Sequence, residues 1–249
     1  MSNGDAPLIE HLIELRSRLL RGAAGLFVVL LCLLPFATDL YGLLAEPLLR
    51  HLPAGQGIIA TNPAGAFFAP IKLALFCALF LTMPWQLYQL WAFVAPALYA
   101  REKRLALPLL ASAVLLFYAG CAFAFFLVLP AVFHFLTSFG AGIIAVTPDA
   151  GAYLDFVLAL FLAFGLSFEL PVAMVILVLL GWVSPAQLKE ARSYAVVGIF
   201  VVAAVVTPPD VVSQLMLAIP MCLLYEIGIH AARWLVPARS VDQGADARS

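Results

Sequence analysis

Long, uninterrupted apolar runs constrain the fold of this chain more than any other feature. A bilayer core about 30 Å thick is crossed by about 20 predominantly apolar residues in a helix. The runs are not alternating, so they do not suggest strands. They predict an all-α, polytopic membrane protein with six transmembrane helices, at about 19–37, 67–94, 105–130, 153–180, 194–206 and 211–229.

The composition supports lipid as the main solvent. Of the 249 residues, 65% are hydrophobic and 11% are charged, and the mean hydropathy is +1.07, whereas a soluble domain carries about 25% charged residues. A net charge of −1 gives no sign of a nucleic-acid partner. The four cysteines lie in apolar runs without a CxxC pair and the histidines are scattered, so we expect no metal site. Metalloprotease, nucleophile-elbow and P-loop motifs are missing from the sequence, so we expect no catalytic site and no cofactor.

Basic residues set the expected topology. Of the 13 Lys and Arg residues, all but Arg50 and Lys72 fall on one side of the predicted spans. Cytoplasmic loops carry the excess of basic residues, so both termini are expected in the cytoplasm. The chain then divides into a cytoplasmic amphipathic segment at 1–18, a membrane domain at 19–229 and a cytoplasmic tail at 230–249 that we expect to be disordered.

Prolines and span lengths predict a bent molecule. Each proline inside a span removes a helical hydrogen bond and favours a kink, and kinked helices suit a concave shape. The fifth span is short, at about 20 Å, and a turn that two prolines impose follows it. The long connections 38–66 and 131–152 are expected to contain short helices. The kink-forming prolines are Pro35, Pro84, Pro108, Pro171 and Pro220, and the turn is Thr207-Pro208-Pro209-Asp210.

Glu169 lies near the middle of the fourth predicted span. An acidic residue at the centre of a membrane helix costs about 2.5–3.5 kcal/mol on insertion scales, so it normally faces a cavity or a partner. Three interpretations are open: a carboxylate that couples proton or ion transport, a polar site where another membrane helix docks, and a protonated glutamate hydrogen-bonded inside the bundle.

Two acidic residues on the predicted cytoplasmic side also have alternative interpretations. Glu14 is spaced to pair with Arg18 along a helix, which contributes a few tenths of a kcal/mol. Glu102 lies among Arg101, Lys103 and Arg104 and balances their charge. Two carboxylates on one face of the membrane also suit recognition of a cationic ligand.

Four motifs in order along the chain resemble the TatC family, the signal-peptide receptors of twin-arginine protein export. The motifs are His11-Leu-Ile-Glu14-Leu-Arg16, Tyr88-Gln-Leu-Trp-Ala-Phe93-Val-Ala-Pro96-Ala-Leu-Tyr99, Phe164-Gly-Leu-Ser-Phe-Glu169-Leu-Pro171-Val and Thr207-Pro-Pro-Asp210.

The resemblance implies specific roles for residues. Glu14 and Glu102 would receive the two arginines of a signal peptide, Arg16 would orient the site, and Phe93 would contact the apolar residues that follow the arginines. Glu169, Thr207 and Gln214 would be polar contacts for partner membrane helices in a glove-like fold. Pro208, Pro209 and Asp210 would form a structural turn, in which Asp210 caps the last span.

The resemblance also implies partners and a location. Expected partners are twin-arginine signal peptides of folded precursors, the single-span subunits TatB and TatA, further copies of the chain, and the lipid bilayer. The expected place is the bacterial inner membrane, with export driven by the proton-motive force. The residues alone leave an alternative open, a proton-coupled small-solute transporter that uses Glu169.

Overall fold

The computed structural model describes residues 5–49, 63–94, 106–132, 149–206 and 211–235, and these are helical almost throughout. Five of the helical stretches are long and apolar enough to cross a membrane, and a shorter apolar stretch runs from Arg192 to Val205. The all-helical membrane fold predicted from the sequence is confirmed. The elements are α1 (Asp5–Leu33), η1 (Leu34–Phe36), α2 (Ala37–Leu49), α3 (Pro63–Val94), α4 (Ala106–Phe123), the π-helical η4 (Ala124–Val128), α6 (Ala150–Phe168), α7 (Leu170–Leu179), α8 (Pro185–Glu190), α9 (Arg192–Val206) and α10 (Val211–Leu235).

Two expected boundaries fall inside helices. α1 continues without a break from Asp5 to Leu33, across the boundary expected at residue 18, which stays a prediction. No residue between Pro7 and Pro35 interrupts a helix strongly, and the charged side chains of this stretch are compatible with helix. The tail expected from residue 230 is still helical to Leu235. Part of the connection 38–66 forms α2, as expected, whereas most of 131–152 lies outside the described residues.

The prolines act in three ways. Pro35 lies in η1, the 3-10 turn that joins α1 to α2, and Pro171 lies in the first turn of α7, directly after the interruption at Glu169. Pro84 and Pro220 are inside α3 and α10. Pro108 is in the first turn of α4, where a missing N–H removes no helical hydrogen bond.

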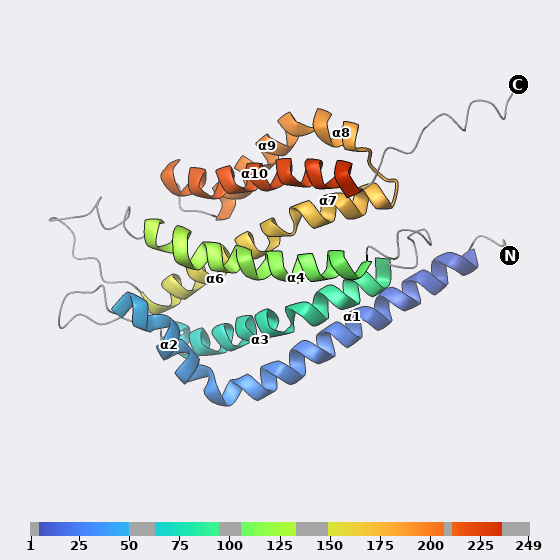
Figure 1. Cartoon of the computed structure of the whole chain (residues 1–249). Helices are drawn as coiled ribbons and strands as arrows, with labels where there is room; N and C mark the ends of the chain where they lie inside the picture. The colour runs from blue at the N-terminus through green and yellow to red at the C-terminus, as the bar shows by residue number, and fades with distance from the viewer. Residues whose placement is uncertain (1–4, 50–62, 95–105, 133–148, 207–210, 236–249) are drawn as a thin grey trace, which may run out of the picture.

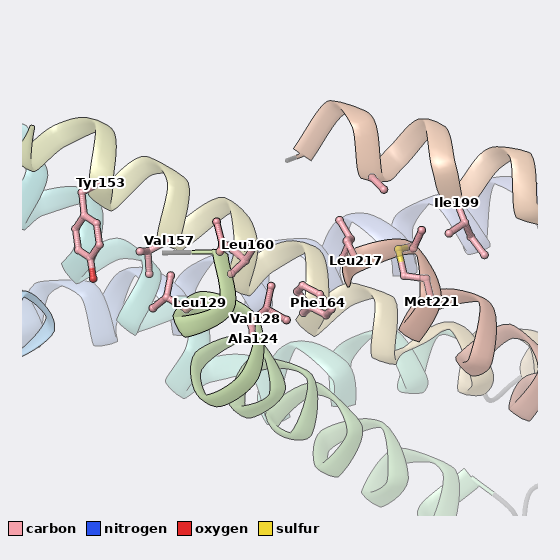
Figure 2. Packing of buried hydrophobic residues seen from close by; sticks show 13 residues of the cluster. Ala124, Val128, Leu129, Tyr153, Val157, Leu160, Phe164, Ile199, Leu217 and Met221 are labelled. Carbon is pink, nitrogen blue, oxygen red and sulfur yellow. The ribbon is translucent and has the colours of Figure 1, made fainter. Parts of the chain in front are cut away.

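The helices pack side by side across the molecule, with α10 between α7 and α9 rather than in chain order. Figure 1 shows α1 and α3 running antiparallel on one side, α9 and α10 on the other, and α4, α6 and α7 between them. One buried cluster joins α3, α4, α7, α8 and α10, around Trp91 and Ile229. A second joins η4, α6, α9 and α10 around residues such as Leu160 and Phe164 (Figure 2). The first cluster includes the end of α3, which carries Phe93, whereas α1 is held to α3 by contacts outside both clusters.

Glycines allow three pairs of helices to approach closely, and in the α1–α3 pair a Cβ on Gly22 would lie 2.6 Å from Oε1 of Gln86. A Cβ built on Gly120 of α4 would lie 2.6 Å from the backbone oxygen of Phe164 on α6, and one on Gly165 would lie 2.7 Å from the Phe117 ring. A Cβ on Gly228 of α10 would lie 2.5 Å from the Met174 sulfur on α7. Small residues at such contacts are the usual means by which membrane helices pack, because the backbones themselves can touch.

The connection between α7 and α9 is closed by local hydrogen bonds. Gly181 has φ of 73°, and the amides of Gly181 and Trp182 donate to the carbonyls of Val178 and Leu177, which is the Schellman ending of a helix. Ser184 and Gln187 form a capping box at the start of α8. The turn is therefore well specified by its own residues.

Candidate functional site

The α1–α3 pair sets the register of the predicted signal-peptide site. The indole nitrogen of Trp85 donates to the carbonyl of Arg21 at 3.2 Å, and the Gln86 amide donates to the carbonyl of Gly22 at 3.0 Å. Since the helices run antiparallel, residues whose numbers sum to about 107 are level with one another. Glu14, eight residues before Gly22, is therefore level with Phe93 and Val94 at the end of α3.

Glu14 already holds a guanidinium group. Arg18, one turn further along α1, donates to the Glu14 carboxylate at 3.3 Å, and the Glu14 side chain is 33% exposed. The pairing predicted from the spacing is confirmed. Arg16 is exposed and Phe93 is half-buried. The structure thus brings Glu14, Arg16 and Phe93 to the same end of one helix pair, whereas Glu102 lies outside the described residues.

Glu169 lies at the interruption between α6 and α7. Its backbone carbonyl accepts from Ala173 at 2.9 Å and its amide donates to Leu166 at 3.1 Å. The side-chain oxygen Oε1 is buried and has no hydrogen-bond partner among the described residues. A buried polar atom without a partner is costly. That observation favours the interpretation that the carboxyl group meets a ligand or another helix.

Gln214 makes a bond inside the chain. Its amide nitrogen donates to the carbonyl of Phe200 at 3.2 Å and so ties α10 to α9. This bond uses one of the two N–H donors of the amide, which leaves the other N–H and the side-chain oxygen for any contact with a partner helix. Thr207, Pro208, Pro209 and Asp210 lie outside the described residues, and their roles remain predictions.

Two ion pairs between helices were missed from the sequence. Lys72 of α3 donates to both carboxylate oxygens of Asp155 of α6, at 2.8 and 3.0 Å, and Arg192 of α9 pairs with Glu226 of α10. Asp155 and Glu226 are acidic residues inside apolar runs, which is the same signal that identified Glu169. Asp155 and Glu226 lie nearer the ends of their spans than Glu169 does, so their positions in the sequence indicated a polar site less clearly.

Metal binding finds no support in the described part of the chain, which contains no group of three or more His, Cys, Asp or Glu side chains placed to hold an ion. The polar groups at the α1–α3 end are instead a carboxylate and guanidinium groups. Of these groups, the Glu14 carboxylate can accept charge-assisted hydrogen bonds from a guanidinium group of a ligand, whereas the arginines repel a cationic ligand.

Comparison with known proteins decides the family. The model of the family described as "Sec-independent protein translocase protein (TatC)" matches residues 10–220. The chain belongs to the TatC family. The resemblance inferred from four motifs is thereby confirmed, and the family is one of translocase components, not of enzymes.

Individual relatives agree with the family assignment. The chain is 53% identical to the TatC protein of Azotobacter chroococcum mcd 1 over 228 residues and 52% identical to that of Escherichia coli (strain K12) over 230 residues, covering 92% of this chain and 89% of each relative. It is 48% identical over 236 residues to that of Halothiobacillus neapolitanus, covering 95% of this chain and 64% of that longer relative. A crystal structure titled "Twin Arginine Translocase Receptor- TatC" superposes with a TM-score of 0.79 at 38% identity, covering 90% of this chain and 99% of the other.

Proposed function

We propose that this chain is the receptor subunit of a twin-arginine translocase. It lies in the bacterial inner membrane with six spans in a concave arrangement and both termini in the cytoplasm. It binds the twin-arginine signal peptides of folded precursors and assembles with TatB, TatA and further copies of itself for export driven by the proton-motive force. The family match replaces the solute-transporter alternative, which drew on Glu169 alone.

The observation that carries the proposal is the Glu14–Arg18 contact beside the end of α3. The Glu14 carboxylate accepts from a guanidinium group at 3.3 Å and remains one-third exposed. An incoming arginine offers the same planar donor group, which lysine does not reproduce. Phe93, level with Glu14, supplies apolar surface for the residues after the arginines. Glu102, in the connection between α3 and α4, is proposed as the second carboxylate.

Binding of a labelled Arg-Arg signal peptide to the purified full chain in nanodiscs tests this proposal. We expect Glu14→Gln to weaken binding about tenfold to a hundredfold, because a hydrogen bond to a charged group contributes about 1.5–3 kcal/mol. A Lys-Lys peptide should bind the wild-type chain more weakly than the Arg-Arg peptide does, by a similar factor. Glu190→Gln is the matched control, since Glu190 is an exposed carboxylate on α8. If the wild type and Glu14→Gln bind both peptides equally well, Glu14 is not part of the site.

Arg18 competes with the ligand for Glu14, so removing it should have the opposite effect. We expect Arg18→Ala to tighten Arg-Arg peptide binding about twofold, because an ion pair at four-residue spacing on a helix stabilises by about 0.3–0.5 kcal/mol. The same titration measures it. Weaker binding by Arg18→Ala would mean that Arg18 orients Glu14 instead of occupying it.

The unpartnered oxygen of Glu169 leads us to propose that a transmembrane helix of TatB or TatA supplies its hydrogen-bond donor, alongside Thr207 and Gln214. We expect Glu169→Met to keep or raise the stability of the isolated chain, by up to about 1–3 kcal/mol, because the orphaned polar atom is removed. The same variant should lose coexpressed TatB during purification, whereas Glu169→Gln should retain part of it. A destabilised isolated chain with normal TatB binding would instead indicate a hydrogen bond inside the bundle.

A further inference from the structure

An open apolar groove lies between α1 and α3. It has a volume of about 540 Å³ and runs from Arg21 to Val29 on α1 and from Leu81 to Trp85 on α3. Ala24 and Gly25 lie on its floor, and the Trp85 indole packs against Gly25, where a Cβ would lie 2.9 Å from the ring. Of the five long spans, the one formed by α1 has the smallest buried share, 6% against 33–50% for the others. The groove therefore opens toward lipid.

The polar groups of the groove wall are already bonded, with one exception. The Thr82 hydroxyl donates to the carbonyl of Ala78 at 2.7 Å, and the Trp85 indole donates to the carbonyl of Arg21. Arg18 is paired with Glu14, but the Arg21 guanidinium has no acidic partner among the described residues. An occupant of this groove is thus hydrocarbon along its length and anionic at the Arg21 end.

The aromatic residues beside Arg21 indicate the depth of that end. Trp85 and Tyr88 stack with ring centroids 5.8 Å apart, and both are more than 40% exposed. Trp and Tyr gather at the level of lipid headgroups, where their rings are apolar and their N–H or O–H groups are polar. Arg21 consequently lies where a phospholipid carries its phosphate.

The length of the groove suits a lipid chain. From Arg21 to Val29 it extends about 12 Å along α1, which part of one acyl chain would cover. A single acyl chain is narrow enough to lie along it. We propose that this groove binds one anionic phospholipid, with its phosphate on Arg21 and one acyl chain between α1 and α3. Since Arg21 follows Glu14 by two turns, about 10 Å along α1, the headgroup lies beside the proposed peptide site.

Quenching of Trp85 fluorescence by chain-brominated lipids tests the proposal on the full chain in phosphatidylcholine vesicles. Brominated phosphatidylglycerol is compared with brominated phosphatidylcholine at equal mole fraction, and Trp85→Phe identifies the Trp85 signal. We expect phosphatidylglycerol to associate about fivefold more strongly, from the attraction of one basic residue for anionic headgroups. Native mass spectrometry should count one bound phosphatidylglycerol per chain.

Matched variants distinguish binding of the lipid headgroup from binding of the acyl chain. Arg21→Gln should abolish the preference, whereas Arg233→Gln, at an exposed position in the last turn of α10, should retain it. Ala24→Leu should reduce quenching by both lipids, whereas Ala23→Leu, exposed on α1 outside the groove, should not.

Three outcomes would overturn the site: equal quenching by the two lipids, equal effects of a variant and its control, or displacement by inorganic phosphate, which would indicate an anion site without a lipid chain. Quenching that falls as the protein-to-lipid ratio rises would overturn it too, in favour of a second copy in the groove. Failure here leaves the peptide-binding result untouched, because Arg21 is not part of the proposed peptide site.

Discussion

Replacing Gly120 with leucine is expected to lower the free energy of unfolding by about 3 kcal/mol. A Cβ at position 120 would lie 2.6 Å from the backbone oxygen of Phe164 and 2.9 Å from the Phe168 ring. The oxygen belongs to the backbone of α6, so it can move only if the whole helix moves. Because α6 also packs against α3, η4 and α9, separation of α4 from α6 would disturb the central cluster (Figure 2).

Titration with SDS in mixed micelles measures this change in the isolated chain. Ala119→Leu is the control, because Ala119 is exposed, is adjacent on α4 and receives a side chain of the same size. We expect the control to stay within about 0.5 kcal/mol of the wild type, as surface substitutions usually do. Equal losses for the two variants would show that leucine is unfavourable in this stretch for a reason other than the α4–α6 contact.

The spans were largely predictable from the sequence, because hydropathy depends on composition and not on neighbours in space. The ends of the spans were less predictable. α1 begins with an amphipathic stretch and continues with an apolar one. The change in composition suggested two segments, although a single helix contains both. The close helix contact at Gly120 could not be predicted from the sequence, since a glycine in an apolar run indicates such a contact only when the facing backbone is known.

The candidate site was predicted in part. The Glu14–Arg18 pair follows from four-residue spacing on a helix, a local rule that needs no tertiary information. That Phe93 is level with Glu14 depends on the α1–α3 register, which the bonds of Trp85 and Gln86 set and which no pattern in the sequence reveals. Glu169 was identified from its apolar surroundings, but only the packing shows that one of its oxygens lacks a partner.

Reversing one charge of the Lys72–Asp155 pair is the second substitution expected to be severe. Lys72→Glu places two carboxylates where Lys72 now donates to Asp155 at 2.8 and 3.0 Å. Both positions lie one to two turns inside their apolar spans, where an unpaired charge is costly. We expect the free energy of unfolding to fall by about 3 kcal/mol. The reason is repulsion between two like charges, which amounts to about 4 kcal/mol at a separation of about 4 Å near a protein surface. The same SDS titration measures it.

A second substitution shows whether the loss comes from the pair itself. Combining Lys72→Glu with Asp155→Lys restores opposite charges across α3 and α6, so the double variant should recover most of the stability that the single one loses. Both side chains are about half exposed, which leaves room for the exchanged side chains to meet. If the double variant is as unstable as the sum of the two single ones, each charge is satisfied by its own surroundings and the pair does not hold α3 against α6. Recovery would mean that this contact, on the side of the membrane opposite the proposed peptide site, joins the α1–α3 pair to the rest of the bundle.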